Sequence, residues 1–154
     1  NKLKIQLKSN TTRTFNLPII ELDEQEQKIP SLNFNVNIKS KSSILNEAIE
    51  DADIVSESVL FEADKHKFNV IAQGDLSKAH VEIKGDDDTK IEVSSEDKIR
   101  SKYSIEYLKK MITASKLADD VDINFGKDYP LKLEYKVIDK MVLSFILAPR
   151  VEND

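Results

Sequence analysis

Residues 128–136 read Asp-Tyr-Pro-Leu-Lys-Leu-Glu-Tyr-Lys, and residues 143–150 read Leu-Ser-Phe-Ile-Leu-Ala-Pro-Arg. From Leu131 onward the first run alternates apolar and charged residues, which is typical of a strand with one buried face. Pro130 has to precede this strand, because a proline inside it would remove a ladder hydrogen bond. The second run is almost wholly apolar as far as Pro149. The two runs therefore predict a pair of strands that closes the fold.

The composition is that of a globular domain. The chain has 154 residues, of which 40% are hydrophobic and 33% charged, enough to build one domain with a core. Its longest apolar stretches are only strand-length, so no membrane-spanning segment is predicted. The absence of cysteine excludes disulfides and thiol chemistry and fits an intracellular protein. With a net charge of -5, any contact with nucleic acid has to be a local basic patch.

The N-terminal part differs from the rest of the chain. Strands expected at 2–8 and 13–20 would form a hairpin, and two strands alone are marginally stable in water. Residues 21–28 are acidic, polar and free of glycine, so they are expected to form an extended linker leading into Ile29-Pro30. Because the chain opens directly in a strand, we expect it to be a piece of a longer protein.

From residue 33 onward, one βαβββ-type unit occurs twice, which predicts an α+β fold. The first copy has expected strands at 33–39, 58–63, 67–73, 79–84 and 89–94, with a helix at 42–55. The second copy has expected strands at 98–103, 121–125, 131–137 and 143–148, with a helix at 104–117.

Both expected helices are amphipathic. The first has an apolar stripe of Ile44, Leu45, Ala48, Ile49, Ala52 and Val55, with Asn46, Glu47, Glu50 and Asp53 outside. The second turns Ile105, Leu108, Met111 and Ile112 inward and has an outer stripe of Glu106, Lys109, Lys110, Thr113 and Lys116. A lysine stripe opposite an apolar one is typical of the solvated face of any such helix, so the spacing alone does not indicate a nucleic-acid site.

The sequence carries no pattern of catalytic or metal-binding residues. His66 and His80 stand without the ligand spacing of a zinc site. The run 86–88 of three aspartates favours a hairpin turn over a calcium loop, which needs spaced ligands and a distal glutamate. Walker, dinucleotide-binding and nucleophile-elbow motifs do not occur. We therefore expect no cofactor, no metal and no enzymatic activity.

Residues 128–150 resemble the end of the DNA sliding clamps, the proliferating-cell-nuclear-antigen family, and most closely its archaeal members. In that family an aspartate-x-proline-leucine strand entering "LEYK" pairs with a final strand that closes in "LAP" plus a base. Residues 22–30 resemble the interdomain linker of the same family. The resemblance covers essentially the whole chain and implies the DNA-clamp fold, with two helices on one face of antiparallel sheets. It implies a terminal hairpin of a truncated N-terminal clamp domain at 1–20, a linker at 21–30 and a C-terminal clamp domain at 31–154.

The resemblance also implies a function. The chain would be a fragment of a ring-shaped processivity factor that encircles duplex DNA without sequence preference and joins other clamp subunits head-to-tail. DNA polymerase, flap nuclease, DNA ligase and clamp loader would dock on it through clamp-binding peptides. No membrane partner is implied. An archaeal protein of this kind would be cytoplasmic and associated with the nucleoid.

Three surfaces follow from the resemblance. The residues implied to face DNA are Lys109, Lys110, Thr113 and Lys116. The pocket for partner peptides would be bordered by Ile29, Pro30, Pro130, Ile146, Leu147, Ala148, Pro149 and Val151. The subunit interface would pair an edge strand carrying Thr12, Phe15 and Leu17 with a neighbour's edge strand carrying Ala79, Val81 and Ile83, each strand offering one apolar face.

Two alternatives stay open. The first helix departs from the family, because Glu47 and Glu50 stand where its members usually carry bases. This favours a peptide-docking clamp subunit with little DNA role of its own. A small hydrolase would instead need two carboxylates that converge in a pocket.

Overall fold

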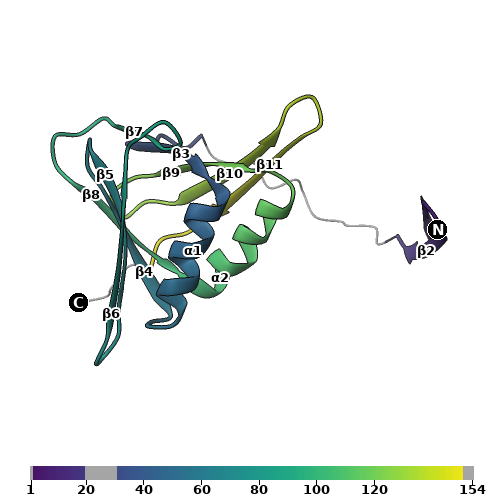
Figure 1. The fold of residues 1–154 in the computed structure, drawn as a ribbon, viewed down its shortest axis with the longest axis horizontal. Helices are drawn as coiled ribbons and strands as arrows, with labels where there is room; N and C mark the ends of the chain where they lie inside the picture. The colour runs from purple at the N-terminus through teal and green to yellow at the C-terminus, as the bar shows by residue number, and fades with distance from the viewer. Residues whose placement is uncertain (1, 20–30, 151–154) are drawn as a thin grey trace. The chain divides into compact units, whose positions relative to one another are not determined.

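A computed structural model of the chain describes residues 2–19 and 31–150 (Figure 1). The chain divides into two units, Asn1–Ser31 and Leu32–Asp154. In the first unit β1 (Lys2–Lys8) pairs antiparallel with β2 (Thr12–Pro18). The register places the apolar side chains on one face, where they are 37 to 52% exposed: Leu3, Ile5, Leu7, Phe15 and Leu17.

The second unit contains two antiparallel sheets and two helical segments. The five-stranded sheet has the order β11 (Met141–Leu147), β10 (Leu131–Val137), β9 (Asp120–Phe125), β3 (Val36–Lys41) and β7 (Lys90–Val93). The four-stranded sheet has the order β6 (Lys78–Lys84), β5 (Lys67–Gln73), β4 (Ser58–Ala63) and β8 (Ile99–Ser104). The helical segments are α1 (Ser42–Asp53), and α2 (Ile105–Met111) continued by the 3-10 helix η1 (Ile112–Lys116).

The two copies of the repeat exchange strands. The meander β4–β5–β6 of the first copy is completed by β8, the leading strand of the second copy. In the same way β3, the leading strand of the first copy, completes the meander β9–β10–β11. The predicted α+β class with two repeats is confirmed, and each sheet contains strands of both copies.

The second helix and the first strand of the unit differ from the sequence-based expectation. The second helix stops being α-helical after Met111, seven residues from its start, and the Thr113 hydroxyl donates to the Lys110 carbonyl oxygen at 2.6 Å. A side-chain hydroxyl that bonds back to the preceding turn competes with regular helix hydrogen bonding. The first strand of the unit begins at Val36 rather than at residue 33.

The aspartate run is a turn between sheets, so the expected hairpin is wrong. Its flanking strands, β6 and β7, lie in different sheets. The Asp86 carboxylate accepts hydrogen bonds from the backbone N–H groups of Asp88 and Thr89 at 2.9 and 2.7 Å. An aspartate that bonds its own following backbone is a turn former. The carboxylate therefore redirects the chain from one sheet to the other.

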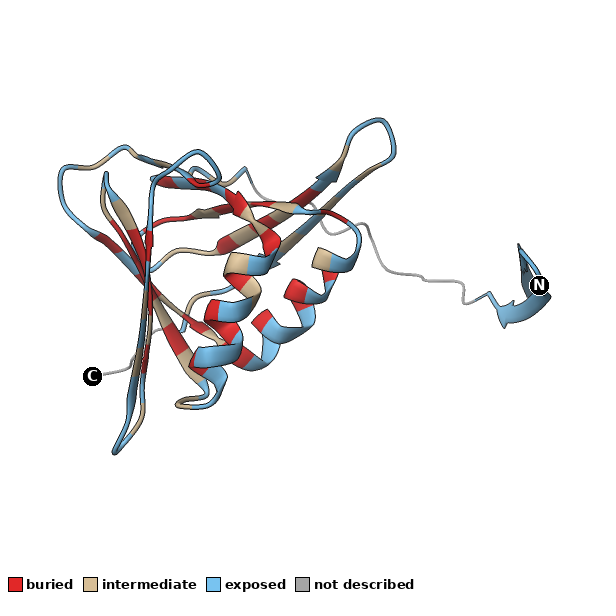
Figure 2. Ribbon diagram, in the orientation of Figure 1, coloured by how far each residue is buried: buried red, intermediate tan, exposed pale blue. Residues whose placement is uncertain are grey.

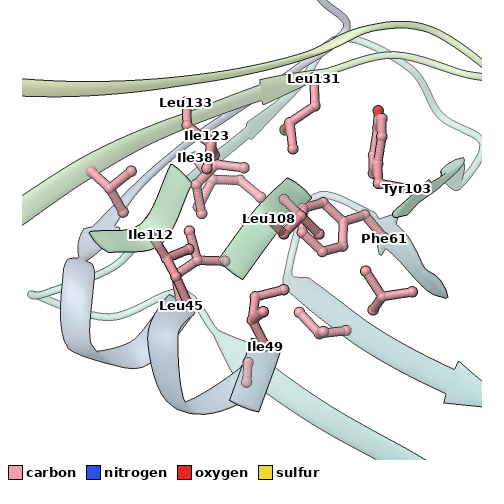
Figure 3. Close-up of a cluster of buried hydrophobic side chains, with 14 of the residues drawn as sticks. Ile38, Leu45, Ile49, Phe61, Tyr103, Leu108, Ile112, Ile123, Leu131 and Leu133 are labelled. Carbon is pink, nitrogen blue, oxygen red and sulfur yellow. The ribbon is translucent and has the colours of Figure 1, made fainter. Parts of the chain in front are cut away.

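The core lies between the helices and the sheets (Figure 3). Both predicted apolar stripes are confirmed, because Leu45, Ile49 and Leu108 are at most 1% exposed. Phe61 packs edge-on against three aromatic rings at centroid distances of 5.1 to 5.9 Å: Phe68, Tyr103 and Phe125. Figure 2 shows that each helix turns buried residues toward the sheets and exposed residues away from them. The outer faces of the helices are therefore open to a ligand.

Candidate functional site

The outer faces of the two helical segments form one surface, here called the helix face. The segments lie side by side in opposite directions (Figure 1): Asp53 at the end of α1 contacts Lys109 of α2, and Asn46 near its start contacts Ser115 of η1. The members of the helix face are all exposed: Glu47, Glu50, Asp53, Glu106, Lys109, Lys110, Thr113 and Lys116. The predicted outer stripe of the second helix is confirmed as exposed.

One expectation for the first helix is corrected. Asn46 is only half-buried rather than an outer residue, and its amide nitrogen donates to the Ser115 hydroxyl at 2.8 Å. Its side-chain oxygen Oδ1 is buried and has no hydrogen-bond partner among the described residues. The contact ties the start of α1 to η1, so Asn46 links the two helices.

Two of the three lysines on the helix face are held by acids. Lys109 Nζ lies 2.6 Å from Asp53 Oδ2, and Lys110 Nζ lies 2.9 Å from Glu106 Oε1. The hydrogen bond from Lys110 lowers the pKa of Glu106, and the same bond raises the pKa of Lys110. Within the described ranges Lys116 has no acid partner. The helix face as defined carries four carboxylates against three lysines, so it is not a basic patch.

Four of the predicted pocket residues meet at the open end of the β10–β11 pair. Because Leu131 pairs with Leu147 and Lys132 pairs with Ile146, Pro130 comes opposite Ala148. Ile146 is 41% exposed on the outer face, and Pro149 follows next to Ala148. These apolar groups could contact the side chain of an extended peptide. The expected members Ile29, Pro30 and Val151 lie outside the described residues.

Leu147, the fifth expected pocket residue in the described part of the chain, lies on the other face of β11. Its strand partner Leu131 is fully buried, and directly paired residues of antiparallel strands share a face. Leu147 accordingly packs against the core. The run is apolar except for Ser144, and that exposed serine was the one sequence signal that Ile146, two residues later, shares the outer face while Leu147 does not.

The structure adds Phe34 and Tyr129, which sequence reasoning missed. Their rings meet edge-to-face at a centroid distance of 6.0 Å, next to Pro130. The Tyr129 carbonyl oxygen accepts a 2.7 Å hydrogen bond from the buried Tyr103 hydroxyl. That bond fixes the loop that carries both Tyr129 and Pro130. The sequence did contain a signal, because the aromatic residue Tyr129 directly precedes Pro130 of the predicted pocket.

The strand β8 is an end strand whose edge is covered. The N–H of Asp128 donates to the Arg100 carbonyl at 3.2 Å, and that of Arg150 donates to the Lys102 carbonyl at 2.7 Å. The segments before β10 and after β11 therefore protect β8. The outer edges of β6 and β11 end their sheets without a further strand among the described residues. An unpaired strand edge is a template for strand addition.

The apolar side of β6 faces the protein's own core, which corrects the expectation that it is offered to a neighbour. Ile83 is 9% exposed, and Ala79 and Val81 pack against the core cluster. The Gly74 N–H donates to the Ser77 carbonyl oxygen at 2.9 Å, and the Gly85 N–H donates to the His66 carbonyl oxygen at 3.3 Å. Opposed residues of an antiparallel pair alternate between hydrogen-bonded and non-hydrogen-bonded pairs, so these two bonds identify which residues of β6 bond to β5. By this alternation the outward backbone groups belong to Lys78, His80, Glu82 and Lys84.

Two carboxylates on the outer sheet faces are held by several cations. Burial would raise the pKa of Glu62, but hydrogen bonds from Arg100 and Lys98 outweigh it and the pKa is lowered. Hydrogen bonds from Lys132 and Lys136 lower the pKa of Glu134 to about 2. Both groups therefore stay ionised at neutral pH, whereas a general acid needs a raised pKa.

The geometry defines an α+β domain with a two-helix face and with outer edges of β6 and β11 that pair with no further strand among the described residues. Residues 28–150 match the family model "Proliferating cell nuclear antigen, C-terminal domain". The chain therefore belongs to the proliferating cell nuclear antigen family.

Individual relatives agree with this assignment. Over 153 residues the chain is 36% identical to a DNA polymerase sliding clamp of Pyrococcus abyssi and 34% identical to that of Pyrococcus horikoshii. Each match covers 99% of this chain and 61% of the relative. The crystal structure of PCNA from Thermococcus kodakaraensis matches with a TM-score of 0.86 and 33% identity, over 97% of this chain and 61% of that one. PCNA of Entamoeba histolytica, 19% identical, has a TM-score of 0.85 over 98% of this chain and 60% of that one, and so shares the fold.

No helix in the described ranges is long and apolar enough to cross a membrane.

Proposed function

We propose that this chain is part of a ring-shaped sliding clamp that encircles duplex DNA and holds replication and repair enzymes on it. One observation carries the proposal: relatives named DNA polymerase sliding clamp match 99% of this chain. The chain spans 61% of the length of these relatives. Residues 1–20 would be the last hairpin of a preceding clamp domain, 21–30 the linker and 31–154 the C-terminal domain. The protein itself would act by topology and carry no catalytic activity.

The DNA proposal rests on the lysines of the helix face. Lysine is a mobile point charge that suits loose, sequence-independent phosphate contacts. Replacing Lys109, Lys110 and Lys116 together by glutamate should leave the fold intact, because the three side chains are exposed. The variant should bind a fluorescent duplex more weakly than the unchanged chain in anisotropy titrations at low salt. Equal binding by both proteins, or tight sequence-specific binding by the unchanged chain, would refute the DNA role.

Assembly would occur by strand addition between the edge of β2 in one subunit and the edge of β6 in the next. The exposed apolar face of the hairpin supports this, because two strands need a covering surface to be stable. The contact joins different surfaces, so it closes into a ring when the rotation permits. His80→Pro removes an outward N–H from β6, and His80→Ala is the matched control. In sedimentation velocity the proline variant alone should lose self-association, and identical behaviour of both would exclude pairing through β6.

Partner enzymes would dock through an extended peptide at Pro130, Ile146, Ala148 and Pro149, beside Phe34 and Tyr129. An apolar anchor would fill the space next to Ile146, with backbone pairing along the following segment. DNA polymerase, flap nuclease, DNA ligase and clamp loader are the proposed owners of such peptides. In an amide-shift titration with a clamp-binding peptide, these residues should move first. Shifts confined to other surfaces would refute the pocket.

A second candidate function is a peptide-docking clamp subunit with little DNA role of its own. The four carboxylates of the helix face favour it, since they oppose the approach of phosphate. The two candidate functions differ in how the assembled parent ring should behave on DNA. An encircling clamp should be retained on circular DNA but lost from linear DNA, because it slides off free ends.

A further inference from the structure

We infer that Asp53 and Glu106 restrain Lys109 and Lys110, and so set how strongly the helix face binds DNA phosphates. The inference rests on the proposed DNA role and deepens it. In this inference the two acids lower the affinity of the neighbouring lysines for phosphate. The observation behind it is the pairing of these charges on the surface that would meet the duplex.

The bridge between Asp53 and Lys109 joins the two helices. Asp53 is the last residue of α1, and its Oδ2 lies 2.6 Å from Lys109 Nζ on α2. The side chain of Lys109 is 50% exposed and that of Asp53 is 40% exposed. The ammonium group of Lys109 is therefore engaged by a carboxylate on the surface that would meet the duplex. A phosphate has to compete with that carboxylate for its charge.

Lys110 is restrained from two sides. Its Nζ lies 2.9 Å from Glu106 Oε1, one helical turn away, and 5.2 Å from the centre of the Tyr107 ring. The Thr113 hydroxyl is also committed, since it donates to the Lys110 carbonyl oxygen at 2.6 Å. Lys116, in contrast, has no acid partner among the described residues. Of the three lysines, Lys116 is therefore the one most ready for a phosphate.

The two ion pairs restrain the lysines only weakly, because they are exposed to water. The paired groups line one shallow hollow of about 620 Å³, which is open to water and ions. Exposed ion pairs are opened by salt and by competing charges. A phosphate that takes Lys109 also comes to lie beside the freed Asp53 carboxylate, which repels it. The pairs therefore lower the affinity for duplex without abolishing it, which suits a protein that has to slide.

The test uses the 154-residue chain and a fluorescent duplex in anisotropy titrations from low to moderate salt. Asp53→Asn removes the partner of Lys109. Glu50→Gln is the matched control: it removes the same charge from the same face, one turn earlier, at an exposed residue without a partner in the described part of the chain. We expect Asp53→Asn to raise the affinity about two- to fivefold and to steepen the slope of log K against log salt by about 0.9, the value of one added phosphate contact. Glu50→Gln should give a smaller gain and leave the slope unchanged.

A second variant pair makes the assignment specific. Adding Lys109→Gln to Asp53→Asn should remove the gain, because no lysine is left to be released. Absence of a gain in Asp53→Asn, an equal gain and slope in Glu50→Gln, or a gain that survives without Lys109 would each overturn the inference. The triple glutamate variant at the three lysines separates this failure from failure of the DNA proposal. If it weakens binding while Asp53→Asn changes nothing, the DNA role stands and the restraint does not.

Discussion

Two ion pairs in this domain have the same length and different surroundings. Arg100 lies 2.6 Å from Glu62 on the outer face of the four-stranded sheet, and Lys109 lies 2.6 Å from Asp53 on the helix face. The Glu62 side chain is only 7% exposed, whereas that of Asp53 is 40% exposed. Glu62 also accepts hydrogen bonds from Lys98 and Asn69, both at 3.3 Å. Asp53 has Lys109 alone among the described residues.

The difference shows that distance alone does not determine how much an ion pair contributes to the free energy of unfolding. A carboxylate removed from water loses its hydration, so the loss of one partner leaves an uncompensated charge. A carboxylate at the surface is rehydrated at once when its partner is removed. The first arrangement suits a structural role that holds β4 to β8. The second suits a surface whose charges can rearrange around a ligand.

The largest expected effect comes from removing the cation beside the buried carboxylate. Arg100→Ala should lower the free energy of unfolding by about 2–3 kcal/mol, because Glu62 keeps only Lys98 and Asn69 as partners. The matched variant Lys109→Ala should change it by less than about 0.5 kcal/mol. Urea unfolding followed by circular dichroism measures both values. Equal losses in the two variants would mean that burial does not distinguish these pairs.

A second partly buried carboxylate, Glu134, extends the comparison to the effect of low pH on stability. The pKa of Glu134 is lowered to about 2 by Lys132 and Lys136, so its ionised form stabilises the fold above the unfolded pKa of about 4.3. That stabilisation is lost as the pH falls from about 4.5 to about 2. It amounts to about 1–2 kcal/mol after allowance for the exposure of the lysines.

Glu134→Gln tests this account, because a glutamine does not titrate. In urea unfolding at a series of pH values, the variant should lose less stability than the unchanged chain between pH 4.5 and pH 2. Glu106→Gln is the exposed counterpart, since the pKa of Glu106 is also lowered but its side chain is 73% exposed. It should follow the unchanged chain closely. Parallel curves for all three proteins would show that Glu134 adds nothing to acid stability.

The smallest expected effect on stability is at the helix face. Asp53→Asn should change the free energy of unfolding by less than about 0.5 kcal/mol, because the bridge is open to water on both sides. Thermal unfolding at 20 and 200 mM salt measures the change and its screening. A loss above about 1 kcal/mol would make Asp53 a structural residue and would remove the contrast with Glu62.

Much of the architecture could be predicted from the sequence alone. The strands β4, β5 and β10 have the predicted bounds, and the apolar stripes of both helices face the core as their spacing indicated. Alternation in a strand and 3.6-residue spacing in a helix follow from local backbone geometry, so neighbouring residues reveal them. The family resemblance rested on similarly short motifs around Pro130 and Pro149, and the family match confirmed it.

Only the tertiary structure decided which residues meet. Leu147 faces the core because its register opposes it to Leu131, and Val81 bonds inward because β5 lies on that side of β6. The contact of Asp53 with Lys109 joins residues 56 positions apart, and it exists because α1 and α2 run in opposite directions. Periodicity gives each element its faces, but sheet order, register and helix direction arise from packing between distant segments. The sequence by itself determined the elements and their buried sides, and packing determined the partners of each charge.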